Sequence, residues 1–369
     1  VPLYAAGKDW PSAPYLRGVS VFFFALALIY LFLLVRRLLS DEEALVAALV
    51  FSTLPLSVFF TRTVQPDGPG IFFIVACYYY LDLWLVEGRK RHFFASVALG
   101  AGVVLIKISF AFFLAPAAYF FFWRRGFAAA FKRATSYMWL LMVVLPSVGW
   151  YSYAHRFPWT FGIWPGREGN KFSTLDGIIR DAPGWHTFTD RAAFEIFTWS
   201  GIVLLIVGFT LLKAKKGLVV FAVWFFSVLF FLLVAIVGNK IHNYYQLPFA
   251  APGAVLIAAG AVAAWRSGWG GRVFLAVAAA VFFVTTQHFL LWHGANFHNE
   301  SVYAQNAHFI DAIKLLNENV PKNEKFVTNE WSPTIYYNSG RLGYYTEEGT
   351  VIKEAVGCMR DDIRYLLLE

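Results

Sequence analysis

The chain has 369 residues, of which 59% are hydrophobic, 19% aromatic and only 15% charged, and its mean hydropathy is +0.56. Soluble domains carry about 25% charged residues, so this composition excludes an ordinary soluble domain. The net charge of +8 does not indicate a nucleic-acid partner, because the basic residues lie in short clusters between apolar runs, as in integral membrane proteins. The two cysteines, Cys77 and Cys358, do not indicate a disulfide framework.

The sequence begins at Val1 without a recognisable signal peptide, and it ends on Leu366 to Glu369 without a turn or a helix cap. We therefore expect that residues are missing upstream of Val1, and that the C-terminus is cut as well.

Apolar runs long enough to cross a bilayer follow one another along the chain, since a helical span needs about 17 to 20 such residues. They cover residues 19–35, 44–60, 70–86, 137–153, 197–212, 218–237, 247–265 and 273–292. The stretch from Phe93 to Trp123 is too long for one span and has Lys107 at its middle. Basic clusters at both of its ends favour a hairpin that turns at Lys107, which gives about ten transmembrane helices.

The distribution of basic residues predicts the orientation of these spans. Alternating sides from the hairpin, one set of loops is markedly richer in Lys and Arg than the other, and the positive-inside rule places that set in the cytoplasm. The basic residues of this set are Arg36, Arg37, Arg89, Lys90, Arg91, Arg124, Arg125, Lys132, Arg133, Lys213, Lys215, Lys216, Arg266 and Arg272. The other segments, residues 1–18, 61–69, 155–195, 238–246 and everything after His293, are then expected outside, and a span upstream of Val1 would carry the first residues there.

The composition changes near residue 294, which predicts a multispan domain at 1–293 and a separate extracytoplasmic α/β segment at 294–369. Ala307 to Asn317 has the apolar spacing of an amphipathic helix, with Phe309, Ile313 and Leu316 on one face. A turn at 320–323 precedes a short predicted strand from Lys325 to Thr328, and the α/β pattern continues to Tyr345. A structural cap is a more economical interpretation of this segment than a catalytic role.

Two polar positions in the membrane region have alternative interpretations. Asp67, in the tight turn Thr61 to Pro69 that also contains Arg62, either caps the next helix or belongs to a site. Lys107 either extends to the lipid headgroups or points into a polar cavity. Asp82, near the cytoplasmic end of its span, is expected to pair with a basic loop residue, and no chemistry is assigned to it.

The segment from Gly238 to Pro248 gathers Lys240, His242, Tyr244 and Tyr245 between two apolar runs. A cation and hydrogen-bond donors at a membrane surface are suited to gripping a lipid-linked phosphate. An interfacial belt of aromatic residues with an anchoring lysine is the alternative, but it does not account for the histidine.

The outer loop from His155 to Glu195 is long for a bundle connection, which often indicates a function. Tryptophans in it lie near carboxylates, a combination that suits sugar binding by stacking and hydroxyl hydrogen bonds. Interfacial tryptophans explain the same residues equally well. The phosphate-binding, dinucleotide, zinc and nucleophile-elbow motifs of soluble enzymes are absent from the sequence.

Four short motifs resemble the polyprenyl-phosphate-dependent glycosyltransferases of the C-type (GT-C) superfamily, which includes protein O-mannosyltransferases and the lipid A aminoarabinose transferase. They are Pro2-Leu3-Tyr4, the Arg62 to Asp67 turn, Leu105-Ile106-Lys107 and the Lys240 to Pro248 segment. Each is weak alone, but their order and their common placement on the predicted outer face make the combination specific. The resemblance covers most of residues 1–292.

The resemblance implies an all-α polytopic membrane enzyme, expected in a bacterial or archaeal plasma membrane. It would move a sugar from a polyprenyl-phosphate donor to a hydroxyl of a lipid, glycan or protein acceptor, with inversion. The implied donor-phosphate residues are Lys240, His242, Tyr244, Tyr245, Arg62 and Lys107. The family's general base precedes the first motif and is therefore expected upstream of Val1, with Asp67 a second candidate. No cofactor is implied; a divalent metal is compatible with the reaction, but no residue is assigned to bind one.

A transporter or flippase of lipid-linked glycans is the alternative function, and it would explain the spans and the outer aromatic residues. It requires ionisable residues along a path through the bilayer, and only Lys107 and Asp82 suggest one. A purely structural membrane subunit would not explain the patch around His242.

Overall fold

The structure, a computed structural model, describes residues 13–154, 156, 182–235, 242–290, 307–328, 339–341, 343–345 and 363–367. The chain divides into two compact units, Pro14–Leu290 and a second unit of Val1–Ala13 with Leu291–Glu369.

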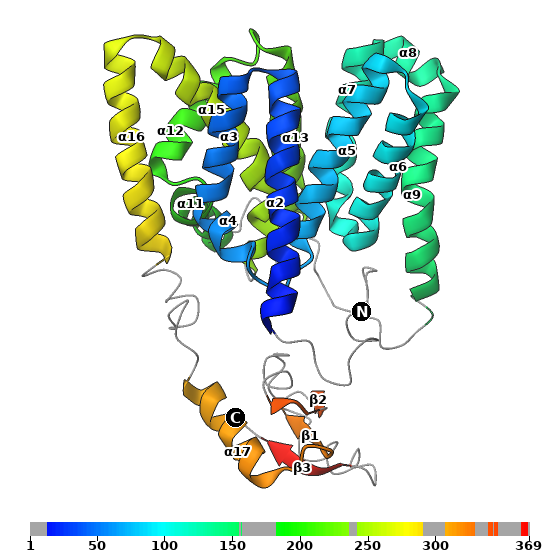
Figure 1. The fold of residues 1–369 in the computed structure, drawn as a ribbon, viewed down its shortest axis with the longest axis vertical. Helices are drawn as coiled ribbons and strands as arrows, with labels where there is room; N and C mark the ends of the chain where they lie inside the picture. The colour runs from blue at the N-terminus through cyan, green and yellow to red at the C-terminus, as the bar shows by residue number, and fades with distance from the viewer. Residues whose placement is uncertain are drawn as a thin grey trace. The chain divides into compact units, whose positions relative to one another are not determined.

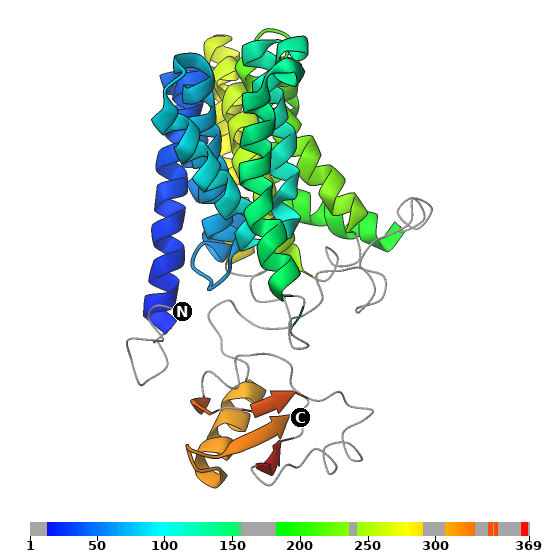
Figure 2. The ribbon, with the colours of Figure 1, turned by 90° about the vertical axis from the view of Figure 1, so that its right-hand side faces the viewer.

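The larger unit is a bundle of helices that run side by side along one axis (Figures 1 and 2). Its first half consists of α2 (Ala13–Leu38), α3 (Asp41–Thr53), α4 (Pro55–Phe60), α5 (Asp67–Glu87), α6 (Lys90–Ile106), the 3₁₀ helix η1 (Ile108–Phe113), α7 (Leu114–Arg125), α8 (Phe127–Lys132) and α9 (Ala134–Ala154). Its second half consists of α11 (Ala182–Arg191), the π-helical turn η2 (Ala192–Ile196), α12 (Trp199–Thr210), α13 (Lys216–Val234), the 3₁₀ helix η3 (Asn243–Phe249), α15 (Ala250–Arg266) and α16 (Trp269–His288).

Helix α15 forms the centre of the second half. Every residue from Ala250 to Val262 is buried, and most of them are alanine or glycine. Small side chains allow the neighbouring helices α3, α12, α13 and α16 to approach it closely. At α12 a Cβ atom at Gly208 would lie 2.1 Å from the Leu256 carbonyl oxygen, and at α16 a Cβ atom at Gly271 would lie 1.9 Å from that of Ala264.

Five helices of the described residues are long and apolar enough to cross a membrane: Tyr15–Leu38, Asp67–Glu87, Lys216–Val234, Asn243–Arg266 and Trp269–His288. A sixth span is possible if the pair Trp185–Ile196 and Trp199–Thr210, bent by 97°, counts as one. The chain is therefore an integral membrane protein, whereas the expected number of ten spans stays a prediction.

Two of the predicted spans differ from a continuous helix over their predicted bounds. The run 44–60 is interrupted at Leu54, because the following Pro55 forces that residue into an extended conformation (φ −56°, ψ 134°). The run 197–212 begins at a bend, where Thr198 has a positive φ of 65° and its side chain caps α12. The break at Leu54 lies within an apolar run, where hydropathy alone gives no sign of it.

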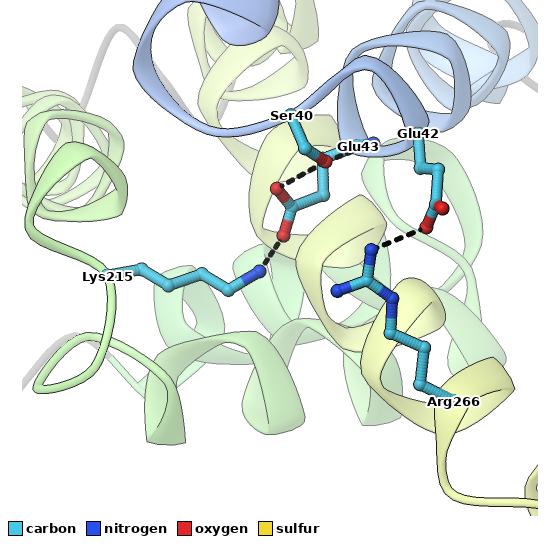
Figure 3. Close-up of polar contacts among 5 residues, drawn as sticks. All are labelled: Ser40, Glu42, Glu43, Lys215 and Arg266. Carbon is cyan, nitrogen blue, oxygen red and sulfur yellow. Dashed lines mark hydrogen bonds and ion pairs between the residues drawn. The ribbon is translucent and has the colours of Figure 1, made fainter.

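The basic clusters gather at one end of the bundle, around the α2–α3, α5–α6 and α7–α8 connections. The expected pairing of Asp82 is confirmed: its fully buried carboxylate accepts hydrogen bonds from Arg37 (2.5 Å) and Arg124 (2.7 Å). At the same end Glu43 pairs with Lys215 and Glu42 with Arg266, so that α3 is tied to the α12–α13 connection and to α15 (Figure 3).

The smaller unit contains α17 (Ala307–Asn319) and a three-stranded parallel sheet of β1 (Lys325–Thr328), β2 (Gly343–Tyr345) and β3 (Ile363–Leu367), in the order β2-β1-β3. The predicted helix and first strand are confirmed at these positions. Leu316, Val320 and Phe326 form a small buried core between helix and sheet. Arg341 donates hydrogen bonds to the Val320 carbonyl oxygen and to Asn317, which fixes the end of α17.

Candidate active site

The predicted turn at Lys107 is present as a break between two helices. Helix α6 ends at Ile106, Lys107 is extended (φ −158°, ψ 115°), and the chain continues in the 3₁₀ helix η1. The break directs the lysine side chain inward: it is only 17% exposed. The Lys107 side chain therefore points into the protein, which disfavours the interpretation in which it extends to the headgroups.

The Lys107 ammonium is held by Asp67, the first residue of α5. Its Nζ atom lies 2.9 Å from Oδ1 and 3.1 Å from Oδ2 of the carboxylate, which is 1% exposed. The helix-cap interpretation of Asp67 is wrong, because the cap position of α5 is Pro66 and the carboxylate is engaged by the lysine. An ammonium has three N–H donors. The Lys107 ammonium can therefore bind the Asp67 carboxylate and still donate a hydrogen bond to another group.

Two tyrosine rings of η3 complete the surroundings of this ammonium. Nζ of Lys107 lies 4.3 Å from the ring centroid of Tyr245 and 5.0 Å from that of Tyr244, within the range of cation–π attraction. The His242 ring stacks on Tyr244 with centroids 5.1 Å apart, and the Phe60 ring meets Tyr244 edge-on with centroids 6.0 Å apart. Residues from α4, α5, the α6–η1 break and η3 thus converge on one lysine.

A glycine, Gly70, lies next to the residues that surround Lys107. A Cβ atom at Gly70, in the first turn of α5, would lie 1.9 Å from the ring of Phe110. Phe110 in turn lies under Lys107, with its ring centroid 5.5 Å from Nζ. Glycine at position 70 therefore allows η1 to pack against the start of α5, which brings Lys107 within reach of Asp67.

Further polar groups lie close in sequence to the pair. Within the described residues, the buried oxygens Gln65 Oε1 and Ser109 Oγ have no hydrogen-bond partner. Each stands two residues from a member of the Asp67–Lys107 pair, and a polar ligand would satisfy them. Arg62, on the same turn as Asp67, lies with its guanidinium 5.8 Å from the Phe59 ring.

A second buried carboxylate, Glu195 in η2, supports η3 and was missed by the sequence analysis. It accepts a 2.9 Å hydrogen bond from the Asn243 side chain and lies 3.9 Å from the Arg191 guanidinium. Its side chain is 11% exposed. The sequence contains a signal for it, a lone carboxylate within the apolar run Ala192 to Phe197, although this run stands at the end of the predicted outer loop.

The structure unites four of the predicted phosphate-binding residues, Lys107, His242, Tyr244 and Tyr245, and places Arg62 on the adjoining turn. Lys240 lies outside the described residues, as does most of the predicted outer loop, including Trp159 and Trp164. Among the described residues no group of three His, Cys, Asp or Glu side chains is arranged to hold a metal ion.

Comparison with known proteins gives this geometry a context. The sequence model of the family described as dolichyl-phosphate-mannose-protein mannosyltransferase matches residues 13–150. No curated protein matches the sequence. Among solved structures, ArnT from Cupriavidus metallidurans bound to undecaprenyl phosphate is similar with a TM-score of 0.62 at 11% identity, over 95% of this chain and 75% of that one.

Resemblance to the C-type glycosyltransferases is thus confirmed. The oligosaccharyltransferase of Archaeoglobus fulgidus, tethered to an acceptor peptide, is similar with a TM-score of 0.54 at 14% identity, over 90% of this chain and 53% of that one. An oligosaccharyltransferase of the same archaeon, in complex with an inhibitory peptide and a dolichol phosphate, gives a TM-score of 0.51 at 14% identity, over 89% of this chain and 53% of that one. At these identities the structural matches establish the fold alone. The assignment of the site residues is based on the geometry of this chain.

Proposed function

We propose that this protein is a membrane glycosyltransferase that moves a sugar from a polyprenyl-phosphate donor to an acceptor hydroxyl, on the extracytoplasmic face, with inversion. The observation that carries the proposal is the Lys107 ammonium, buried against Asp67 and ringed by Tyr244 and Tyr245 at one end of the spans. It lies in a fold that matches a structure bound to undecaprenyl phosphate.

The chemistry requires positive charge where the sugar departs. When the sugar leaves, negative charge grows on the donor phosphate, and donors held in a water-poor site stabilise that charge far more than they would in water. Lys107 supplies such donors, and His242 and Arg62 are additional cationic or hydrogen-bonding groups. We assign to Lys240 the same role.

Asp67 is a positioning residue in this proposal. Its carboxylate is engaged by Lys107, so that it fixes the ammonium and balances its charge before the donor arrives. Without that carboxylate, an isolated buried ammonium would be costly to maintain. We assign the proton-accepting role toward the acceptor hydroxyl to none of the described carboxylates.

The topology that accompanies the proposal has about ten spans, basic loops in the cytoplasm and the Lys107 end outside. The multispan domain would comprise residues 1–293, and the α/β segment 294–369 would be extracytoplasmic. The short helices α3 with α4, α6 and α7 would then be spans whose length is completed by the irregular turns beside them, and α9, with 21 residues, would be a span by itself.

The test is transfer by the full-length protein in liposomes supplied with polyprenyl-phosphate sugars carrying a radiolabel in the sugar. Lys107→Met removes the ammonium and keeps most of the side-chain volume. We expect it to lower the transfer rate about 100-fold or more, as the loss of one donor to a developing anion does. The matched control is Lys132→Met, a change of the same type at an exposed lysine in α8, which should leave the rate unchanged.

Because removing one member of a buried pair destabilises a protein, a second variant is needed. Lys107→Met with Asp67→Leu removes both charges, and such replacements are often tolerated. A folded double variant that still fails to transfer supports the proposal, while transfer at the wild-type rate by either folded variant contradicts it. The transporter alternative predicts movement of the intact labelled lipid across the bilayer without release of polyprenyl phosphate, so product analysis separates the two functions.

A further inference from the structure

A groove in the side of the bundle has no role in the proposed reaction. It has a volume of about 470 Å³ and lies between α3, α12, α15 and α16. Its walls are almost entirely apolar, with Leu49, Leu204, Val262 and Phe282 among them. Cavities of this size are common for small-molecule ligands. Two of the four walls, α15 and α16, are candidate membrane spans, so an occupant would be a lipid tail.

The length of the groove matches one leaflet of a bilayer. Along α3 its lining runs from Glu42 to Thr53, which corresponds to about 16 Å at 1.5 Å per residue. Half of the hydrocarbon core of a membrane is about 15 Å thick. An acyl chain that enters from the membrane surface at Glu42 would therefore end near the bilayer midplane, at Thr53.

The surface end of the groove is marked by two arginines and a tryptophan. Arg266, the last residue of α15, binds Glu42 through one guanidinium nitrogen at 2.8 Å, and both side chains are more than half exposed (Figure 3). Arg272 of α16 lies 5.0 Å from the ring of Trp265, which also lines the groove. In the part of the chain that the structure describes, Arg272 has no carboxylate partner, so this end carries an uncompensated positive charge.

We propose that this groove binds one acyl chain of an anionic glycerophospholipid, with the lipid phosphate bound by Arg266 and Arg272. Arginine suits this role because its forked N–H donors match a phosphate, and only one nitrogen of Arg266 is engaged by Glu42. Basic pockets between transmembrane helices are established binding places for anionic headgroups. Trp265 has the amphipathic ring that belongs at headgroup depth.

The site is separate from the candidate active site. Helix α15 begins beside η3, which carries Tyr244 and Tyr245, and reaches Arg266 after 17 residues, or about 25 Å. A polyprenyl donor chain is also a poor match, since it is longer than the depth of one leaflet, whereas the groove ends within it. The lipid would stabilise the contact of α3 with α15 and α16, from the leaflet opposite to the active site.

The experiment titrates delipidated full-length protein with phosphatidylglycerol or phosphatidylcholine of identical acyl chains and counts bound lipids by native mass spectrometry. We expect preferential binding of phosphatidylglycerol, and Arg266→Ala and Arg272→Ala should each weaken it about fivefold. Arg133→Ala, an exposed arginine of the same end outside the groove, is the matched control. Bound lipid should also raise the thermal unfolding temperature of wild type, since it binds the folded state.

A second pair of variants tests the groove itself. Ala279 lines it and Ala280, its neighbour on α16, does not, while both are exposed. Ala279→Phe should abolish binding of phosphatidylglycerol, and Ala280→Phe should leave this binding unchanged. Equal binding of the two lipids by wild type, or equal binding by the two phenylalanine variants, would overturn the proposal. So would a dimer that Ala279→Phe dissociates, because it would identify a second copy of the chain as the occupant.

Discussion

The strongest stability prediction concerns Asp82, which joins three helices at the basic end of the bundle. Its carboxylate is fully buried and accepts one hydrogen bond from Arg37 of α2 and one from Arg124 of α7. Arg124 also stacks on Trp123 at 3.8 Å. Asp82→Asn keeps the shape of the side chain but removes the negative charge, which leaves two guanidinium groups facing each other around a neutral amide.

The expected magnitude follows from burial. Removing one partner of a fully buried ion pair destabilises a protein by about 3–5 kcal/mol. The two arginine side chains are 27% and 25% exposed, so water screens part of the effect, and we expect the lower end, about 3 kcal/mol. A change of this size lowers the ratio of folded to unfolded protein by about a hundredfold.

The assay is equilibrium unfolding of the purified protein in detergent, followed by a tryptophan signal. The matched control is Asp41→Asn, which removes the partner of Arg36 in a pair whose side chains are 56% and 72% exposed. Exposed pairs contribute about 0–1 kcal/mol, so this variant should be close to wild type. If Asp82→Asn were no more destabilising than Asp41→Asn, the reasoning from burial would be refuted.

Three further predictions concern packing, the support of the site and topology. Gly208→Ala should lower the unfolding temperature, because the new methyl group would meet the α15 backbone at 2.1 Å. Gly149→Ala, with open space around it, should not, and equal shifts for the two variants would contradict the packing of α12 on α15. Glu195→Ala should reduce transfer through the displacement of η3, with Glu195→Gln, which can still accept from Asn243, retaining more activity than alanine; equal losses would exclude a positioning role. In intact cells, a cysteine at the exposed Lys132 should be shielded from an impermeant thiol reagent and one at the exposed Val64 should be labelled, and the reverse pattern would invert the orientation.

Much of the bundle could be predicted because hydropathy and charge report directly on burial in a membrane. The break at Lys107 could be predicted from the sequence, because burying a lysine within an apolar run costs free energy unless the backbone brings the side chain to a partner. The pairing of Asp82 was readable for the same reason. The break at Leu54 was not predicted, because it lies within a run whose apolar character continues unchanged on either side. The bend at Thr198 was not predicted, because it lies at the start of an apolar run, where the residues before it were taken for a loop.

The site was predictable in its residue types but not in its pairings. Motif resemblance gave Lys107, Asp67 and the tyrosines of η3, which are far apart in the sequence. No pattern states that Asp67 holds Lys107 across 40 positions, because that contact depends on the close approach of Phe110 to Gly70. Glu195 was overlooked because its partner, Asn243, is 48 positions away.

Within the described part of the bundle, several irregular backbone segments lie together at the candidate site. The α4 turn, the start of α5, η2 and η3 contact one another, and the break at Lys107 joins them through its side chain. Within a bilayer, backbone outside regular helices is tolerated only where protein or a polar cavity satisfies its free groups. Broken helices also aim N–H groups and side chains at a common point, as membrane proteins do when they bind polar substrates at depth. A purely structural bundle would gain nothing from these interruptions. The interruptions therefore argue, independently of any motif, that this end of the bundle is built to hold a polar ligand.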